Sequence, residues 1–311
     1  MSDDLERQNR ELPAAPTVGP ASRAQSVIAG LLTEPLAPGL YLVATPIGNL
    51  GDITLRAMSV LARADVVYCE DTRHSAKLLH HYAISTRTRP FHDHNEERES
   101  ERIIGELKSD KRVAIISDAG TPLLSDPGFK LVRAVAGEGI PVFAIPGASA
   151  LLSALTVSGL PTDAFFFAGF LPPKQAARRS RLSELSQIPG TLVFYEAPHR
   201  VTETISDMAQ LLGGRRAAIA RELTKLHEDI VRGSLAELVE ATAGDDLKGE
   251  VAIVVGPEQA VPVSDDVLTA RLADALEVMS LKDAAKALAD ELGVPKARVY
   301  GLGLKARDAR R

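Results

Sequence analysis

The chain has 311 residues, with 36 Lys and Arg against 41 Asp and Glu, and a formal net charge of −5. This length allows two domains and a small third one, and the apolar fraction of 45% is enough to form real cores. The negative balance argues against a uniformly basic coat for nucleic acid, although local basic patches are still allowed. The single cysteine, Cys69, excludes an internal disulfide and is typical of a reducing cytoplasm.

The first residues carry no sign of a membrane span or an export signal. No apolar run reaches the length of a membrane helix, and several acidic residues precede the first apolar stretch, Val27–Leu32. We therefore expect a soluble, cytoplasmic protein. Residues 1–38 mix Pro, Ala, Ser and both charges without periodicity, which predicts a disordered leader.

From Gly39 onward, apolar strands alternate with amphipathic helices, and we expect an α/β domain over residues 39–160. Such alternation is typical of a mostly parallel sheet that is covered on both faces. The predicted strands are Leu40–Thr45, Asp65–Glu70, Arg112–Ser117 and Ile140–Ile145. The predicted helices lie near Asp52–Arg63, Thr72–Tyr82, Asn95–Leu107 and Phe129–Ala136. Three polar residues at helix starts are predicted N-caps: Asp52, Asp71 and Asn95.

A second α/β domain is expected over residues 161–257, after an apolar helix within Pro146–Leu160 that closes the first. A hairpin-like piece, Asp229–Arg232, suggests that its sheet is mixed. The predicted strands are Ala164–Phe170, Thr191–Tyr195, Arg216–Ala220 and Glu250–Val255. The predicted helices are Gln175–Gln187, Pro198–Leu212 and Ser234–Ala241.

After a linker, Gly256–Ser264, residues 265–311 form a helical tail with a helix-turn-helix outline. Its end, from Lys296 onward, carries six basic residues against one Asp. The alternative is a solvated helix pair that simply packs on the second domain. Gly301 and Gly303 weaken the last predicted helix. The three predicted helices are Asp265–Met279, Leu281–Leu292 and Pro295–Arg307.

Polar, Gly- and Pro-rich loops follow strand ends in both domains, which predicts a cleft at the carboxyl ends of the strands. A phosphate loop of the Gly-x-x-x-x-Gly-Lys type, a Gly-x-Gly-x-x-Gly turn and zinc-type Cys/His spacing are all missing from the sequence. We therefore expect no metal, and a ligand with a cationic centre that is held largely by backbone groups. The six loops are Thr45–Asp52, Glu70–Arg73, Ser117–Gly128, Pro146–Ala150, Tyr195–Arg200 and Arg221–Lys225.

These loops, in this order, resemble the tetrapyrrole-methylase superfamily, and most closely its members that act on ribosomal RNA. The resemblance covers about residues 39–256, and the helical tail is similar to an extension found in many of these proteins. Further motifs that carry it are His94–Glu96, Ser158–Pro161, Gly169–Pro172, Phe194–Glu196, His199–Arg200 and Gly249–Glu250.

The resemblance implies two α/β domains with S-adenosylmethionine between them. It also implies 2′-O-methylation of a cytidine ribose in the decoding region of 16S rRNA, on the small ribosomal subunit. Homodimers are common in the superfamily, so a homodimer is allowed as well. Carried over to this chain, the implied cofactor contacts are Pro46, Asp118, Ala119, Gly120, Thr121, Pro122, Ser125, Ser149, Ala150, Tyr195 and Glu222.

Methyl transfer to a ribose hydroxyl is helped by correct positioning and by a nearby base. We expect that base or orienting group among His94, Glu96 and His199. Glu196 and Glu222 are further candidates for the same role. Phosphate contacts are expected from basic residues, because neutralised backbone charge carries RNA affinity. These are Arg73, Lys174, Arg178, Arg179, Arg181 and Arg200.

Two other functions fit the same sequence. A C-methyltransferase acting on a small tetrapyrrole has the same fold, and a carboxylate-rich macrocycle would also attract Arg and Lys. A non-catalytic RNA-binding assembly factor is the other alternative, and the intact loops argue against it. Measuring cofactor binding and identifying the methyl acceptor distinguishes these two functions from rRNA methylation.

Overall fold

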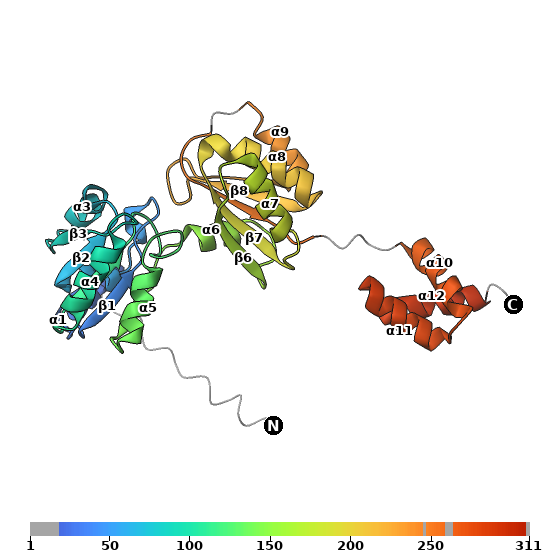
Figure 1. The fold of residues 1–311 in the computed structure, drawn as a ribbon, viewed down its shortest axis with the longest axis horizontal. Coiled ribbons are helices and arrows are strands. Elements are labelled where there is room, and N and C mark those ends of the chain that lie inside the picture. Colours follow the sequence, from blue (N-terminus) through green and yellow to red (C-terminus); the bar gives the residue numbers. More distant parts are fainter. Residues whose placement is uncertain (1–18, 245–246, 259–263, 309–311) are drawn as a thin grey trace, which may run out of the picture. The chain divides into compact units, whose positions relative to one another are not determined.

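A computed structural model gives the fold, and it describes residues 19–244, 247–258 and 264–308. The chain divides into two compact units, Met1–Glu258 and Gln259–Arg311. The first unit contains two five-stranded sheets, and the second is helical (Figure 1).

The first sheet is parallel throughout and has the strand order β3-β2-β4-β1-β5. The edge strand β3 was not predicted: it is only three residues long and ends in Pro90, so it lacks the apolar run that marks the other strands. The five strands are β1 (Gly39–Val43), β2 (Val66–Cys69), β3 (Thr88–Pro90), β4 (Arg112–Ile116) and β5 (Val142–Ile145).

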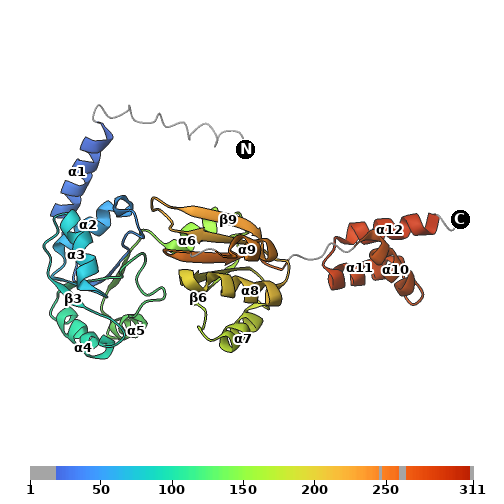
Figure 2. The same cartoon turned by 90° about the horizontal axis from the view of Figure 1, so that it is seen from above.

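Helices cover both faces of this sheet, as predicted (Figure 2). On one face, α2 (Leu55–Arg63) and α3 (Thr72–His81) bury apolar side chains against β1 and β2. On the other face, α4 (Glu96–Leu107) and α5 (Phe129–Gly137) pack on β1, β2 and β4. Consecutive strand residues point to opposite faces, so the strands are apolar along their whole length.

The helix caps differ in part from the prediction. Asp71 caps α3 by accepting the N–H of Arg73 at 2.8 Å. Asp52 ends a short 3₁₀ turn, η2 (Leu50–Asp52), and Thr54 caps α2 instead. Asn95 precedes α4, but its side chain accepts from the N–H of His92 and donates to the Pro90 carbonyl, so it holds the loop rather than the helix.

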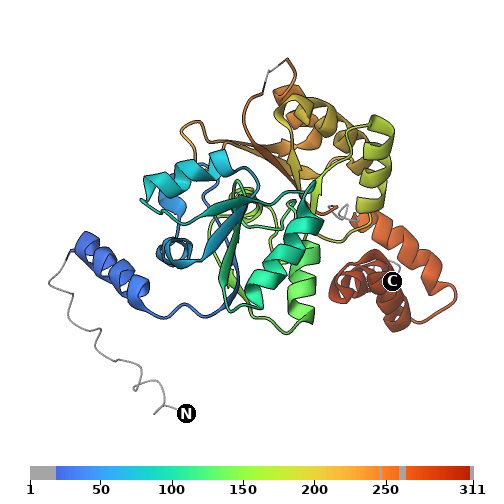
Figure 3. The same cartoon turned by 60° about the vertical axis from the view of Figure 1, so that its left-hand side comes forward.

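The predicted disordered leader is wrong for its second half, because α1 (Pro20–Thr33) is a helix; residues 1–18 lie outside the described part. No side chain of α1 is buried. Figure 3 shows α1, in dark blue, projecting from the first domain. Its C-terminal end is held by polar contacts: the Leu31 carbonyl accepts from Ser59 Oγ and Arg63 Nη1, each at 2.8 Å. Apolar periodicity could not show a helix that is anchored in this way.

The second sheet is mixed, as predicted, with the order β6-β7-β10-β8-β9. Only β6 and β7 run parallel; the remaining neighbours are antiparallel. The five strands are β6 (Phe165–Phe170), β7 (Thr191–Glu196), β8 (Arg216–Arg221), β9 (Asp229–Ser234) and β10 (Val251–Val255).

One face of the second sheet packs against three helices, α7 (Gln175–Leu185), α8 (Val201–Leu212) and α9 (Leu235–Ala241). The opposite face is covered by α6 (Ala150–Val157), which follows the last strand of the first sheet. The sequence had placed this helix at the end of the first domain, whereas its apolar side chains pack on the second sheet.

The helical unit contains α10 (Asp265–Leu276), α11 (Leu281–Leu292) and α12 (Lys296–Asp308). The last helix is continuous despite its glycines. Gly303 is buried, and a Cβ there would collide with Leu281 Cδ1, so the absence of a side chain lets the helices approach closely. Within the described segments, no helix combines the length and apolarity that a membrane crossing requires.

Candidate functional site

The topology of the first sheet marks one place for a ligand. Strands β1 and β4 are neighbours, but the chain leaves β1 toward α2 on one face and leaves β4 toward α5 on the other. Such a divergence opens a crevice at the carboxyl ends of the strands. The loops that follow these two strands therefore begin on either side of a natural binding site.

The two loops are joined at their base. Thr45 and Gly120 exchange backbone hydrogen bonds of 2.9 and 3.0 Å. The Thr45 hydroxyl also donates to the Ser117 carbonyl, and the Thr121 hydroxyl donates to the Ala148 carbonyl, at 3.2 and 3.3 Å. Three loops are thus fixed to one another before any ligand arrives, which reduces the loss of freedom on binding.

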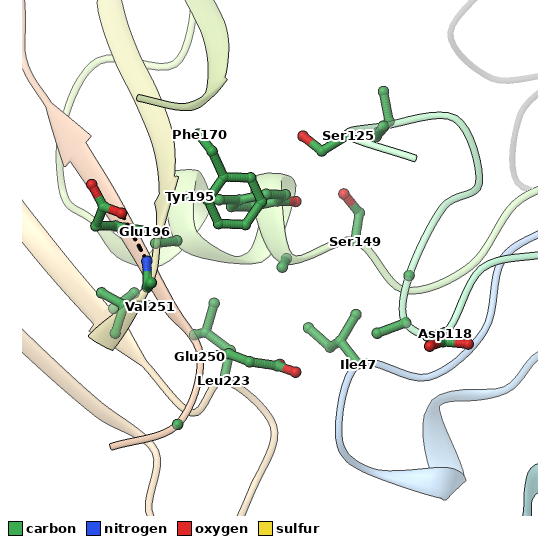
Figure 4. Close-up of a pocket in the computed structure, with 18 of the residues that line it drawn as sticks. Ile47, Asp118, Ser125, Ser149, Phe170, Tyr195, Glu196, Leu223, Glu250 and Val251 are labelled. Atoms are coloured by element: carbon green, nitrogen blue, oxygen red, sulfur yellow. Dashed lines mark hydrogen bonds between the residues drawn. The ribbon is translucent and has the colours of Figure 1, made fainter. Parts of the chain in front are cut away.

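A cavity of about 380 Å³ lies between these loops and the second sheet (Figure 4). The volume falls in the range of small-molecule and cofactor sites. Loops of the first domain provide one part of the wall: Ile47, Asp118, Ala119, Gly120, Thr121, Leu124, Ser125, Asp126, Ser149 and Ala150. The second sheet and its loops provide the other: Phe170, Tyr195, Glu196, Ala197, Pro198, Ala220, Leu223, Gly249, Glu250, Val251 and Ala252.

Most residues implied as cofactor contacts lie at this cavity, while three do not. Pro46 and Pro122 are buried beside wall residues, and Glu222 lies behind the wall. The Oε1 atom of Glu222 accepts from the Glu250 N–H at 2.9 Å and from Lys225 Nζ at 2.7 Å. The hydrogen bond from Lys225 holds the pKa of Glu222 below its usual range. Glu222 therefore supports the backbone of a wall residue.

The cavity loops hold strained backbone. Among the described residues, six that are not glycine have positive φ, and four of these belong to the loops after β4 and β8: Leu123, Ser125, Glu222 and Thr224. Left-handed conformations are unfavourable for residues with a Cβ and tend to occur at functional sites. This loop path is therefore imposed by the surrounding contacts rather than by local preference.

The charge of the wall is one-sided. It contains the carboxyl groups of Asp118, Asp126, Glu196 and Glu250, and no Lys, Arg or His belongs to the described lining. Glu196 is compensated by the Thr204 hydroxyl at 2.7 Å and by Arg200 Nε at 3.4 Å. Glu250 pairs with Lys225 Nζ at 3.2 Å. Asp118 and Asp126 form no ion pair among the described residues, and their carboxyl groups leave a negative potential that favours a ligand with a positive centre.

Asp126, on the cavity wall, has a raised pKa. Burial, with a smaller contribution from the charge of Glu70, raises the pKa of Asp126 to about 6. An unfolded Asp titrates near pH ~4. Between these values the folded protein retains a proton that the unfolded chain has lost, so stability falls as pH rises, and the loss is complete above pH ~6.

Asp126→Asn should therefore stabilise the protein at pH 8, by about 1 kcal/mol once solvent screening is allowed for, and should have little effect at pH 4. Urea unfolding at the two pH values measures this difference. Asp163→Asn, which changes an exposed carboxyl that does not contribute to the pKa of Asp126, is the control. An equal effect of Asp126→Asn at both pH values would contradict the argument.

The three residues predicted to act as base do not line the cavity. His94 and His199 are exposed, and Glu96 accepts the Gly128 N–H at 3.1 Å, so it anchors the end of the loop after β4. The rings of His92 and His94 lie 5.9 Å apart, edge to face. No group of three His, Cys, Asp or Glu side chains among the described residues is arranged to hold a metal ion.

Two of the predicted phosphate contacts are structural instead. Arg178 is 1% exposed and its Nε lies 2.7 Å from Oδ2 of the equally buried Asp207. Arg200 donates from Nη2 to the carbonyls of Leu171 and Pro172, at 2.9 and 3.1 Å, and so fixes the loop after β6. A basic run in the sequence cannot show which of its members faces the core.

The other basic residues reach solvent. Arg73 pairs with Asp71 and remains almost fully exposed, and Lys174 is exposed at the start of α7. Arg179 contacts Asp207 and Gln210 and is partly exposed. Arg181 pairs with Glu184 at 2.8 Å in a similarly open position.

Several wall residues were not predicted as contacts. Ile47, Leu124 and Asp126 lie in loops that had been assigned to the cleft, so their position in those loops was a usable signal. Phe170, Glu196, Gly249 and Glu250 belong to motifs that carried the resemblance, but had no assigned contact. Ala220 and Ala252 carry no local signal, since they are ordinary strand residues.

Comparison with known proteins agrees with this architecture. Residues 39–239 match the family described as Tetrapyrrole (Corrin/Porphyrin) Methylases, and residues 262–307 match the RsmI C-terminal HTH domain. The ribosomal RNA small subunit methyltransferase I of Mesorhizobium japonicum is 49% identical over 280 residues, covering 88% of this chain and 94% of the relative. The protein of the same name from Vibrio cholerae is 46% identical, covering 86% and 95%.

A solved structure shows the same fold at lower similarity. The uroporphyrin-III C-methyltransferase of Thermus thermophilus, complexed with S-adenosylhomocysteine, is 20% identical with a TM-score of 0.50, covering 70% of this chain and 97% of the other. The family match spans most of both α/β domains and includes the cavity wall except for residues 249–252. The chain therefore belongs to the tetrapyrrole methylase family.

Proposed function

We propose that this protein transfers a methyl group from S-adenosylmethionine to the ribose 2′-oxygen of a cytidine in the decoding region of 16S rRNA. The acceptor is the small ribosomal subunit, and the reaction takes place in the cytoplasm. The observation that carries the proposal is the close similarity, over both α/β domains and the helical unit, to proteins named as small-subunit rRNA methyltransferases.

The residues of the cavity fit this donor. Gly120 has φ +79° at the wall, and a Cβ there would lie 3.2 Å from Cγ2 of Ile47. Because this position carries no side chain, a ligand can come close to the backbone of the wall. Asp118, whose carboxylate forms no ion pair among the described residues, supplies negative charge for a positively charged donor. When bound, the donor supplies a methyl group on a sulfonium centre, for which an uncharged acceptor oxygen is a sufficient nucleophile once it is positioned.

The chain's own residues must then hold the acceptor and receive its proton. A general base works best when its pKa is near the working pH. Asp126 meets this condition, and it lies on the cavity wall, unlike His94, Glu96 and His199. Its carboxylate is the proposed proton acceptor.

RNA contacts come from exposed cations on α7 and from the helical unit. Lys174→Glu combined with Arg181→Glu should weaken binding of the small subunit most strongly at low salt. It should also reduce the slope of log affinity against log salt by roughly one for each lost phosphate contact. Filter binding between about 50 and 200 mM salt measures this, because affinity that depends on phosphate contacts falls steeply over that range.

The control for these charge reversals is Lys108→Glu combined with Lys111→Glu, which makes the same charge change at the exposed end of α4. Donor affinity should be unchanged in both proteins when measured by calorimetry. Equal subunit binding by the double variant and the control across the salt range would remove α7 from the RNA interface.

The proposed function is tested by mass mapping of rRNA from cells with and without the gene. We expect one cytidine of 16S rRNA to lose a ribose methyl group when the gene is absent, and to regain it when purified protein, donor and small subunits are mixed. Unchanged rRNA, together with methylation of a uroporphyrinogen-type acceptor, would replace the proposal by the tetrapyrrole alternative.

A further inference from the structure

We propose that the ring of Phe170 is a stacking platform for the nucleobase of the target nucleotide, at the rim of the donor cavity. This inference rests on the proposed function and names the subsite that the acceptor occupies. Phe170 lines the cavity and is nevertheless 57% exposed. An aromatic ring that is open to water at the edge of a ligand site is free to stack on a second ligand.

A β-bulge aims this ring at the cavity. Strands β6 and β7 pair regularly up to Phe167 and Val193, but the next partners are Gly169 and Phe194, so Ala168 is an extra residue. An extra residue reverses the faces of the side chains that follow it. Phe170, paired with Tyr195, therefore lies on the cavity side instead of the side covered by α7 and α8.

The neighbouring rings confirm that orientation. The centroids of Phe167 and Phe170 lie 4.9 and 5.7 Å from the centroid of Tyr195, both in edge-to-face arrangements. Figure 4 shows Phe170 next to Tyr195, across the cavity from Ser125. Glycine suits position 169 for two reasons: its φ is +66°, and a Cβ there would lie 3.3 Å from Ser125 Oγ, so the strand and the loop after β4 can lie close together.

The deeper wall is sufficient for the donor without Phe170. Ala220, Ala252, Leu223 and Ile47 are each less than 10% exposed and form a narrow apolar surface. The cavity volume of about 380 Å³ is at the lower end for cofactor-sized ligands. With one donor bound there, the exposed ring at the rim is left for the acceptor.

A ribose hydroxyl within folded RNA reaches such a site most easily when its nucleotide leaves the base stack. Enzymes that modify nucleotides commonly turn the target out and replace its lost stacking with aromatic side chains. Lys174 follows Phe170 at the other end of the short loop that Arg200 fixes, so a cation for the adjoining phosphate accompanies the ring.

The test compares Phe170→Ala with Phe170→Trp, and with Phe166→Ala on the opposite face of the same strand. Phe166 is a matched control because it is also partly exposed, at 37%, and does not line the cavity. Phe170→Ala should lower kcat/KM for small subunits about tenfold to a hundredfold, the usual effect of removing one base–aromatic stack. Phe170→Trp should restore most of this activity, and Phe166→Ala should retain it.

Two readouts separate stacking from other roles. Donor affinity by calorimetry should change less than about twofold in Phe170→Ala, since the deeper wall is intact. Subunits reconstituted with a fluorescent cytidine analogue at the mapped position should show a fluorescence change with the wild type and with Phe170→Trp, and none with Phe170→Ala.

Full activity of Phe170→Ala, or a loss of donor affinity as large as the loss of kcat/KM, would overturn the proposal while the proposed function stands. An equal loss of activity in Phe166→Ala would do the same. A wild-type protein that transfers no methyl group to small subunits removes both the proposed function and this subsite.

Discussion

Gly120→Val should weaken S-adenosylmethionine binding by about a hundredfold or more. Gly120 has φ +79°, and its missing side chain faces Ile47 across a contact of 3.2 Å. A valine would add left-handed strain and overpack the wall, and the two effects together correspond to roughly 3 kcal/mol. Because Gly120 also exchanges backbone hydrogen bonds with Thr45, movement of the loop would disturb the floor of the cavity.

Gly139→Val is the matched control, since Gly139 has a similar φ of +70° but no atom within 4 Å of the position of a Cβ. Both variants carry the strain, while only Gly120→Val obstructs the cavity. Calorimetry with the donor and circular dichroism on heating distinguish binding from folding. Gly120→Ala extends the comparison if the valine variant folds poorly. Equal donor affinity in the two valine variants would refute the position of the donor.

Asp207→Ala should lower the free energy of unfolding by about 3–5 kcal/mol, which corresponds to a drop in Tm of roughly 10 °C. Asp207 is 2% exposed and accepts from Arg178 Nε at 2.7 Å, Arg179 Nη1 at 3.1 Å and Gln175 Nε2 at 3.3 Å. Without this carboxylate, the buried guanidinium of Arg178 keeps the exposed Glu203 as a charged partner and the Pro173 carbonyl as an acceptor, each at 3.5 Å. An uncompensated buried charge is among the most destabilising defects.

Arg181→Ala is the control for this prediction. It removes an ion pair on the same helix, but both partners are open to solvent, so the change should stay within about 0.5 kcal/mol. The double variant Arg178→Met/Asp207→Leu should recover much of the lost stability, because apolar groups of similar size can replace a buried pair. Urea unfolding of all three proteins tests this. If the Asp207→Ala protein is as stable as the Arg181→Ala protein, the Arg178–Asp207 pair does not stabilise the fold by the expected amount.

The Arg178–Asp207 pair also illustrates the limit of sequence reasoning about α7. Lys174, Arg178, Arg179 and Arg181 look alike as a basic run, and all were predicted to contact phosphate. Helical geometry turns Arg178 toward α8, where its Nε donates to Asp207, a residue 29 positions later in the chain. Its role depended on a partner that no local pattern identifies.

At the cavity, too, some features could be located from the sequence and others could not. The loops after β1, β4, β5, β7 and β8 could be located from sequence, because apolar strands that end in Gly, Pro and Asp predict their own boundaries and parallel strands end on one edge. The Ala168 bulge could not, because one extra residue in a strand leaves no trace in composition. The proposed catalytic function of Asp126 also escaped notice, since its pKa depends on burial and on Glu70, far earlier in the chain.

Local chemistry in the sequence was thus enough to determine the alternation of strands and helices, the two α/β domains with a helical tail, and five of the six loops that were predicted at the cleft. The sixth loop, Glu70–Arg73, does not line the cavity. Only the tertiary structure decided which side chain in each loop faces the cavity, which arginines are buried, and that α6 packs on the second sheet. The physical reason is range: strands, helices and turns follow from neighbouring residues, whereas burial, pKa and the direction of a side chain depend on atoms brought together from distant parts of the chain.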